Sequence, residues 1–189
     1  GVDLHRTRNG GNTWRKITDT YLERTDPKYA HADHHVLLMP AAVPGRVYDG
    51  NDGGLDVSEN AGDRWQNRSN GLAVTMFYDL DIAQTTGLVF GGGAQDNGTV
   101  VTNIGVPSSF FELLGGDGGW IVFDPNDARH LYASYQNFQI YRFREGRGIK
   151  VSPRASVGEQ ESVWMCFITF DPNNSNNIIA GAADAGIFL

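Results

Sequence analysis

Two copies of one eight-residue pattern constrain this chain more than any other feature of its sequence. Residues 7–14 read TRNGGNTW and residues 58–65 read SENAGDRW, and the two tryptophans lie 51 positions apart. A hydroxyl and an Asn side chain can bond back to the backbone of a tight loop, and glycine permits a positive φ. We expect the tryptophan to pack each loop onto a sheet. The shared positions are Thr7, Asn9, Gly11 and Trp14 in the first copy and Ser58, Asn60, Gly62 and Trp65 in the second.

Two further repeats predict β-hairpins. The motif FDPN occurs at 123–126 and again at 170–173, each time followed by a second apolar run, and each copy reads as a strand, an Asp-Pro turn and another strand. Turns rich in Asp, Asn and Gly follow at 51–54, 95–98 and 183–186. Such periodicity, at intervals of about 40 to 50 residues, is typical of a fold assembled from repeated sheets.

The eight-residue pattern resembles the Asp-box, or BNR, repeat of sialidases, sortilin-like receptors and xyloglucanase-like glycoside hydrolases. The chain as a whole is most similar to bacterial proteins of the glycosyl hydrolase, BNR-repeat type. In these proteins the box closes the hairpin between the third and fourth strands of a propeller blade. The resemblance therefore implies an all-β fold, a β-propeller of four-stranded antiparallel blades. Asn stands at the Asp position of the box in both copies.

The repeats divide the single predicted domain, residues 1–189, into blades. The first range would supply only a third and a fourth strand, and the last only a first to a third strand. We therefore expect a fragment of about four blades, taken from a propeller of about seven or more blades or from a double propeller. The remaining blades would lie outside this chain. The predicted blade ranges are 1–20, 34–66, 75–111, 118–151 and 162–189.

Composition excludes several classes of partner. A net charge of −7 argues against nucleic acid, because phosphate binding needs a basic face. No apolar run approaches the roughly 20 residues of a membrane span. The single cysteine, Cys166, permits no internal disulfide, and its apolar neighbours predict a buried thiol. The resemblance implies a secreted, periplasmic or extracellular protein without a cofactor.

Neighbouring strands of a blade run in opposite directions. The loop that enters the first strand of each blade therefore lies on the same face of the propeller as the turn after the second strand. Carboxylates, imidazoles and aromatic rings from several blades would meet there in an axial cup, a mixture suited to a polyhydroxylated ligand. We predict catalytic roles for Asp117 and Asp33, and we note Glu161 as a further carboxylate on this face. The predicted ligand-binding residues are His31, His35, Asp52, Asp96, Tyr78, Trp120 and Trp164.

Each of these residues also has a structural interpretation. Asp52 and Asp96 can simply cap their turns. His31, Asp33 and His35 can form a structural hydrogen-bond network or hold a metal ion, but they share a side only if the segment is extended, so we expect no metal. Asp117, flanked by four glycines, can belong to a glycine-rich turn.

Function remains open between two classes. The first is a carbohydrate-binding or carbohydrate-hydrolysing propeller, and hydrolysis would need two carboxylates. Within the resemblance a xyloglucanase-like enzyme is favoured over a sialidase, since sialidases need three arginines on the cup face and the arginines here fall mostly elsewhere. The alternative is a non-catalytic, sortilin-like propeller that binds a protein or peptide.

Overall fold

The computed structural model describes residues 1–103, 106–152, 164–171, 174–181 and 187–188. Every regular element in these ranges is a β-strand, so no helix in the described part could span a membrane. The chain divides into two compact units, unit 1 (Gly1–Val74) and unit 2 (Thr75–Leu189), and each is described by itself. Within both units the sheets are antiparallel meanders whose strands follow chain order, which is the construction of propeller blades.

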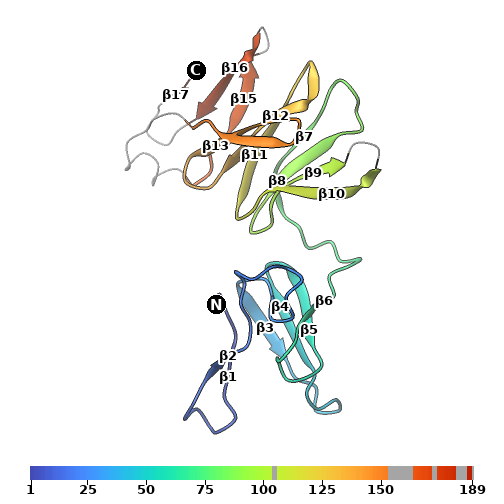
Figure 1. The fold of residues 1–189 in the computed structure, drawn as a ribbon, viewed down its shortest axis with the longest axis vertical. Helices are drawn as coiled ribbons and strands as arrows, with labels where there is room; N and C mark the ends of the chain where they lie inside the picture. Colours follow the sequence, from blue (N-terminus) through green and yellow to red (C-terminus); the bar gives the residue numbers. More distant parts are fainter. Residues whose placement is uncertain (104–105, 153–163, 172–173, 182–186, 189) are drawn as a thin grey trace. The chain divides into compact units, whose positions relative to one another are not determined.

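Unit 1 holds one two-stranded and one four-stranded sheet (Figure 1). The strand pair β1–β2 packs next to the sheet β3–β6: the Arg6 guanidinium contacts Asp63 at 2.8 Å and also donates to the Ala61 carbonyl. This ion pair lowers the pKa of Asp63, with the hydrogen bond from Arg6 as the main cause. The strands are β1 (His5–Arg6), β2 (Arg15–Lys16), β3 (His34–Leu38), β4 (Val47–Asn51), β5 (Gly54–Ser58) and β6 (Gln66–Asn67).

The described residues of unit 2 form three sheets, and the first strand of the middle sheet contacts both of the others. β11 packs against β7 and β8 on one side and against β15 on the other. The approach is close, because a Cβ added to Gly93 in β8 would lie 1.8 Å from the Gly119 carbonyl oxygen in β11. The strands are β7 (Phe77–Ile82), β8 (Phe90–Ala94), β9 (Gly98–Asn103), β10 (Val106–Leu114), β11 (Gly118–Asp124), β12 (Asp127–Tyr135), β13 (Gln139–Arg144), β14 (Arg147–Lys150), β15 (Ile168–Asp171), β16 (Asn174–Gly181) and β17 (Ile187–Phe188).

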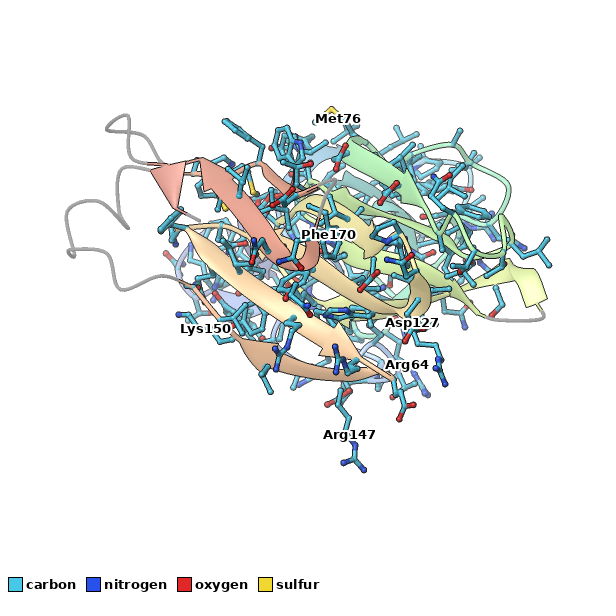
Figure 2. All side chains as sticks on the ribbon, turned by 90° about the horizontal axis from the view of Figure 1, so that it is seen from above. Arg64, Met76, Asp127, Arg147, Lys150 and Phe170 are labelled. Atoms are coloured by element: carbon cyan, nitrogen blue, oxygen red, sulfur yellow. The ribbon has the colours of Figure 1, made fainter. Side chains whose placement is uncertain are left out.

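The apolar core of unit 2 lies between these sheets. One cluster joins β9 to the next sheet through Val101, Ile121 and Leu131, and a second joins β12 and β13 to β15 and β16. Cys166 belongs to the second cluster and is fully buried, as predicted, so burial raises the pKa of its thiol to about 11. The outer strand β14 is exposed along its length, and Arg147 points away from the sheet (Figure 2).

Both eight-residue loops fold in the same way, and we call them the Asn-Gly loops (residues 7–14 and 58–65). In the second loop the Ser58 hydroxyl accepts from Gly62 N at 2.8 Å, and Asn60 Oδ1 accepts from Arg64 N at 2.8 Å. The first loop repeats these bonds from Thr7 and Asn9, each at 2.9 Å. Each loop connects the two strands of a hairpin, β1 to β2 and β5 to β6. The predicted side-chain-to-backbone bonding is therefore confirmed.

The two tryptophans of these loops differ in burial. Trp65 is 4% exposed and packs with Ala30 and Val47, and its indole N–H donates to the Ile17 carbonyl at 3.1 Å. Trp14 is 63% exposed, so the prediction that it packs its loop onto a sheet is wrong. Trp65 packs on the hairpin that precedes its own sheet, and the described residues before Trp14 contain no such hairpin.

The other predicted turns fall between consecutive strands where the structure describes them. Residues 51–54 join β4 to β5, residues 95–98 join β8 to β9, and an Asp-Pro turn joins β11 to β12. In that turn Asp124 accepts from Asn126 N at 2.8 Å and from His130 Nδ1 at 2.8 Å. The turn at 183–186 and the Pro-Asn pair at 172–173 lie outside the described residues. The blade boundaries themselves stay a prediction.

Candidate functional site

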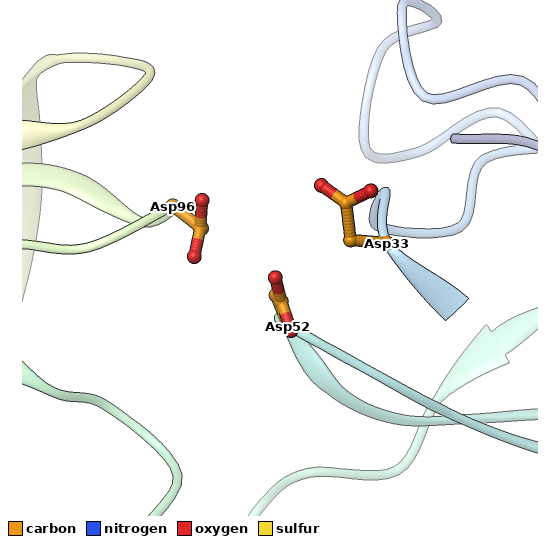
Figure 3. Close-up of side chains that lie close together, drawn as sticks. All are labelled: Asp33, Asp52 and Asp96. Atoms are coloured by element: carbon orange, nitrogen blue, oxygen red, sulfur yellow. The ribbon is translucent and has the colours of Figure 1, made fainter. Parts of the chain in front are cut away.

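Four predicted site residues lie together in unit 1. His31 and Asp33 precede β3, His35 lies in β3, and Asp52 lies in the turn between β4 and β5. His35 Nε2 is 2.5 Å from Asp52 Oδ1, and one carboxylate oxygen of Asp33 lies within 4.8 Å of one of Asp52. Figure 3 shows these two carboxylates close to each other. We call this group (His31, Asp33, His35 and Asp52) the His-Asp edge.

The backbone does not run straight through this group. Asp33 has a φ of 60°, so the chain is not extended immediately before β3. His31, Asp33 and His35 could share one side only in an extended segment, and that condition is not met. His31 instead packs against the turn that carries Asp52: a Cβ added to Gly53 would lie 2.5 Å from the His31 Cβ. The side chain of His35 is 65% exposed and that of Asp52 is 30% exposed. The edge is therefore accessible to solvent in unit 1.

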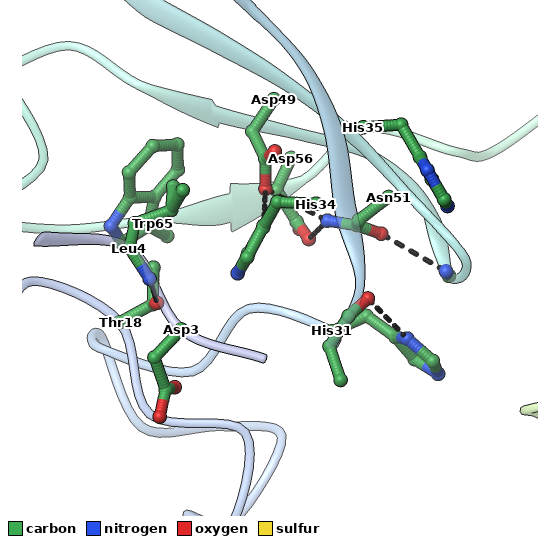
Figure 4. A network of polar contacts seen from close by, with 12 residues as sticks. Asp3, Leu4, Thr18, His31, His34, His35, Asp49, Asn51, Asp56 and Trp65 are labelled. Atoms are coloured by element: carbon green, nitrogen blue, oxygen red, sulfur yellow. Dashed lines mark hydrogen bonds and ion pairs between the residues drawn. The ribbon is translucent and has the colours of Figure 1, made fainter. Parts of the chain in front are cut away.

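A buried polar network lies beneath the His-Asp edge (Figure 4). His34 Nδ1 is 2.7 Å from Asp49 Oδ2, and the Asn51 amide donates to Asp49 at 2.9 Å and to Asp56 at 2.8 Å. The Asn51 carbonyl oxygen also accepts from Gly53 N at 3.0 Å. The network thus fixes β3 on β4 and shapes the β4–β5 turn. Sequence reasoning missed it, although the spacing of Asp49 and Asn51, two apart on one strand, was a usable signal.

The His-Asp edge has a defined chemical capacity. Its carboxylates accept hydrogen bonds, and its imidazoles donate or accept according to tautomer. The short His35–Asp52 contact orients one imidazole, leaving the rest of that ring toward solvent. A group of this kind can bind hydroxyl groups, and a carboxylate pair is also the minimum equipment for glycoside hydrolysis.

Asp117 of unit 2 is used within the protein. One of its carboxylate oxygens accepts from Asp96 N at 3.1 Å, and its own N–H donates to Gln136 Oε1 at 2.7 Å. The residue is only 9% exposed. It therefore ties the β8–β9 turn and the β12–β13 turn to the entry of β11. This geometry favours the glycine-rich-turn interpretation, since Gly116 also has a positive φ of 64°.

The remaining candidates of unit 2 lie in or before first strands, except Asp96, which lies in the β8–β9 turn. Tyr78 in β7 and Trp120 in β11 are half-buried, and Trp120 packs edge-on against Phe167 with ring centroids 6.3 Å apart. Trp164 is 54% exposed, and its carbonyl accepts from Asn137 N at 3.0 Å. Among these, the structure brings Asp96 and Asp117 into contact. Glu161 lies outside the described residues.

Sequence reasoning also missed two acidic residues that join neighbouring sheets. Asp79 and Asp81 alternate along β7, and their carboxylates accept from Ile121 N at 3.2 Å and from Phe123 N at 2.7 Å. β11 is the edge of its sheet, so these carboxylates bond backbone N–H groups that face away from β12. Burial raises the pKa of Asp79. Both aspartates therefore have a structural role between sheets.

No protein-family model and no curated protein matches this chain. Among solved structures, an ancestral GH74 enzyme is 16% identical with a TM-score of 0.47, covering 84% of this chain and 22% of that one. The GH74 xyloglucanase from Xanthomonas campestris is 17% identical with a TM-score of 0.43, covering 98% and 33%. YCF48 bound to D1 peptide is 13% identical with a TM-score of 0.45, covering 98% and 56%. The chain thus spans less than two thirds of the length of each of these proteins.

Proposed function

We propose that this chain belongs to an Asp-box β-propeller that binds a carbohydrate through the His-Asp edge. The observation that carries the proposal is the contact of His35 with Asp52, beside the carboxylate of Asp33, on a solvent-accessible edge. Sugar hydroxyls both donate and accept, so a mixture of carboxylates and imidazoles satisfies them well. The protein would act in a secreted, periplasmic or extracellular setting.

Pre-organisation supports the same proposal. The buried network of His34, Asp49 and Asn51 fixes the strand and the turn that carry His35 and Asp52. A site whose side chains are already ordered loses less conformational entropy when a ligand binds. The assignment to the Asp-box family is supported by the identical hydrogen bonds of the two Asn-Gly loops.

The proposal extends to hydrolysis if the protein is a glycoside hydrolase of the xyloglucanase-like class. Asp33 and Asp52 are the carboxylate pair of unit 1, with oxygens within 4.8 Å. Retaining glycosidases hold their two carboxyl groups about 5 to 5.5 Å apart. In that mechanism one residue protonates the leaving oxygen and the other forms the covalent intermediate. The test is glycan hydrolysis by the variants. Loss of turnover in Asp33→Asn or Asp52→Asn, with turnover retained in Asp117→Asn, would support this assignment.

Binding is tested by titrating the chain with xyloglucan oligosaccharides and a wider panel of glycans in a calorimeter. His35→Ala and Asp52→Asn each remove a charged or charge-paired hydrogen-bonding group, so they should weaken binding by about tenfold to a hundredfold, from roughly 1.5 to 3 kcal/mol per bond. Glu23→Gln, an exposed carboxylate of the same unit, is the matched control and should bind like the wild type. Equal affinity in all four proteins, or no binding to any glycan, would refute the proposal.

A second candidate, binding of an extended peptide, is favoured by one observation. β3 is the edge strand of its sheet, and its apolar side chains are exposed: Val36 is 63% exposed, Leu37 54% and Leu38 57%. An exposed strand edge can add a peptide strand through main-chain hydrogen bonds. Leu37→Lys should weaken such binding, because it places a charge on the exposed apolar edge, and should leave glycan binding by Asp52 intact.

A further inference from the structure

A pocket of about 240 Å³ lies between two sheets of unit 2, beside the first apolar cluster and apart from the candidate site residues. The preceding sheet contributes Val101 of β9 and Phe111 and Leu113 of β10. The next sheet contributes Leu131 of β12 and Phe143 of β13. The wall is mostly apolar. Arg129 and Glu145 also line it, and their charged groups are 3.4 Å apart.

Unit 1 provides an internal template for this place. There the space between the strand pair β1–β2 and the sheet β3–β6 is filled by Trp65, which packs with Val47 of β4 and Ile17 after β2. Val47 stands in the sequence RVY at 46–48, and Leu131 stands in HLY at 130–132, each in the second strand of its sheet. Val47 and Leu131 therefore both face the last strand of the preceding sheet. In unit 2, Leu131 lines the pocket.

The chain itself explains why no indole of its own occupies this place in unit 2. Both hairpins begin with the same backbone bond, from Ala61 N to the Gly45 carbonyl in unit 1 and from Glu145 N to the Arg129 carbonyl in unit 2. After that bond the β5–β6 loop continues through residues 62–65, whereas β13 joins β14 through Glu145 and Gly146 alone. Their φ values of 52° and 76° fit a two-residue type I′ turn, which has no room for a tryptophan.

We propose that this pocket binds a small aromatic molecule of indole size. An engineered cavity of about 150 Å³ with similar apolar walls binds benzene, so about 240 Å³ accommodates a fused two-ring system. The ring would take the place that the Trp65 side chain takes in unit 1. Glu145 supplies an acceptor for a ring N–H, as the Ile17 carbonyl does for Trp65, and the Arg129 guanidinium can lie over a ring face.

The probe for this site is indole itself, added to protein labelled with ¹³C at Leu and Val methyl groups. Saturable shifts should appear at Val89, Val101, Leu113 and Leu131, which line the pocket, and should be absent at Val36 and Leu38 of unit 1. Ala128 also lines the pocket, so Ala128→Phe should fill it and weaken indole binding at least tenfold. This loss of affinity would follow from the pocket volume that the new ring occupies.

Two further variants keep the test decisive. Ala73→Phe adds the same ring at an exposed position of unit 1 and should bind indole like the wild type. Ala128→Leu adds a smaller side chain, and it replaces Ala128→Phe if circular dichroism shows that the larger variant does not fold. The proposal is overturned if indole near its solubility limit moves no pocket methyl group, or if a folded Ala128 variant keeps the wild-type affinity.

Discussion

Replacing each loop tryptophan by alanine should have very different effects on stability. Trp65 is 4% exposed and its indole N–H bonds the Ile17 carbonyl at 3.1 Å, whereas Trp14 is 63% exposed. Truncating a buried aromatic residue costs about 3 to 5 kcal/mol, and an exposed substitution usually changes stability by less than about 1 kcal/mol. We therefore expect Trp65→Ala to lose about 4 kcal/mol, a large share of the stability of a small domain. Trp14→Ala should lose about a tenth to a quarter of that.

The measurement is unfolding in urea followed by far-ultraviolet circular dichroism, with the midpoint and slope of each transition compared rather than the signal amplitude. Both tryptophans belong to unit 1, so the same transition should shift in both variants. Trp65→Phe is the control for packing: it keeps an aromatic ring but loses the N–H bond, and it should lose only about 1 to 2 kcal/mol. Equal losses for Trp14→Ala and Trp65→Ala would refute the role assigned to Trp65 in joining the two sheets of unit 1.

Three further predictions test other parts of the structure. Gly62→Ala should destabilise more than Gly11→Ala, because both have positive φ but only at Gly62 would the new Cβ meet a packed side chain, at 2.5 Å; equal losses in urea would contradict this. Asp81→Ala should cost about 1 to 3 kcal/mol by leaving the Phe123 N–H without its acceptor, while Asp81→Asn, which keeps an oxygen, should cost less; reversal of that order in thermal unfolding would contradict the bond. The Cys166 thiol should resist iodoacetamide at pH 8 until the protein unfolds. Its folded pKa of about 11 lies above the ordinary 9.0, so stability should be intact below pH 9 and fall by about 2 to 3 kcal/mol as pH rises to 11, and a Cys166→Ala variant should lack that fall.

Local chemistry explains which parts of the fold could be predicted from sequence. The bonds of the Asn-Gly loops join residues only four apart, as from Gly11 N to Thr7, so the pattern of residue types determines them. The same holds for the turns between strands. Burial of Trp14 or Trp65 depends instead on which hairpin lies beside the loop, and two identical motifs cannot carry that information.

The candidate site residues differ in the same way: local contacts could be predicted from the sequence, and contacts between distant segments could not. Alternation along β3 was a sound guide, because His34 points to the buried Asp49 while its neighbour His35 points to Asp52. The role of Asp117 was not accessible in this way, since its carboxylate bonds the backbone of Asp96 across 21 positions of sequence. A carboxylate among glycines looks the same whether it faces a ligand or a neighbouring turn.

Contacts between sheets decide which polar residues are already engaged in holding the fold together. Asp79 and Asp117 are half-buried or buried, and their oxygens bond backbone N–H groups of neighbouring segments, so a ligand would compete with the fold for them. Asp52 and its partner His35 are both partly exposed, so a ligand can reach them from solvent. Displacing Asp117 would leave the Asp96 N–H without its acceptor, at a cost of about 1 to 3 kcal/mol. This difference supports our proposal that a ligand binds at the His-Asp edge.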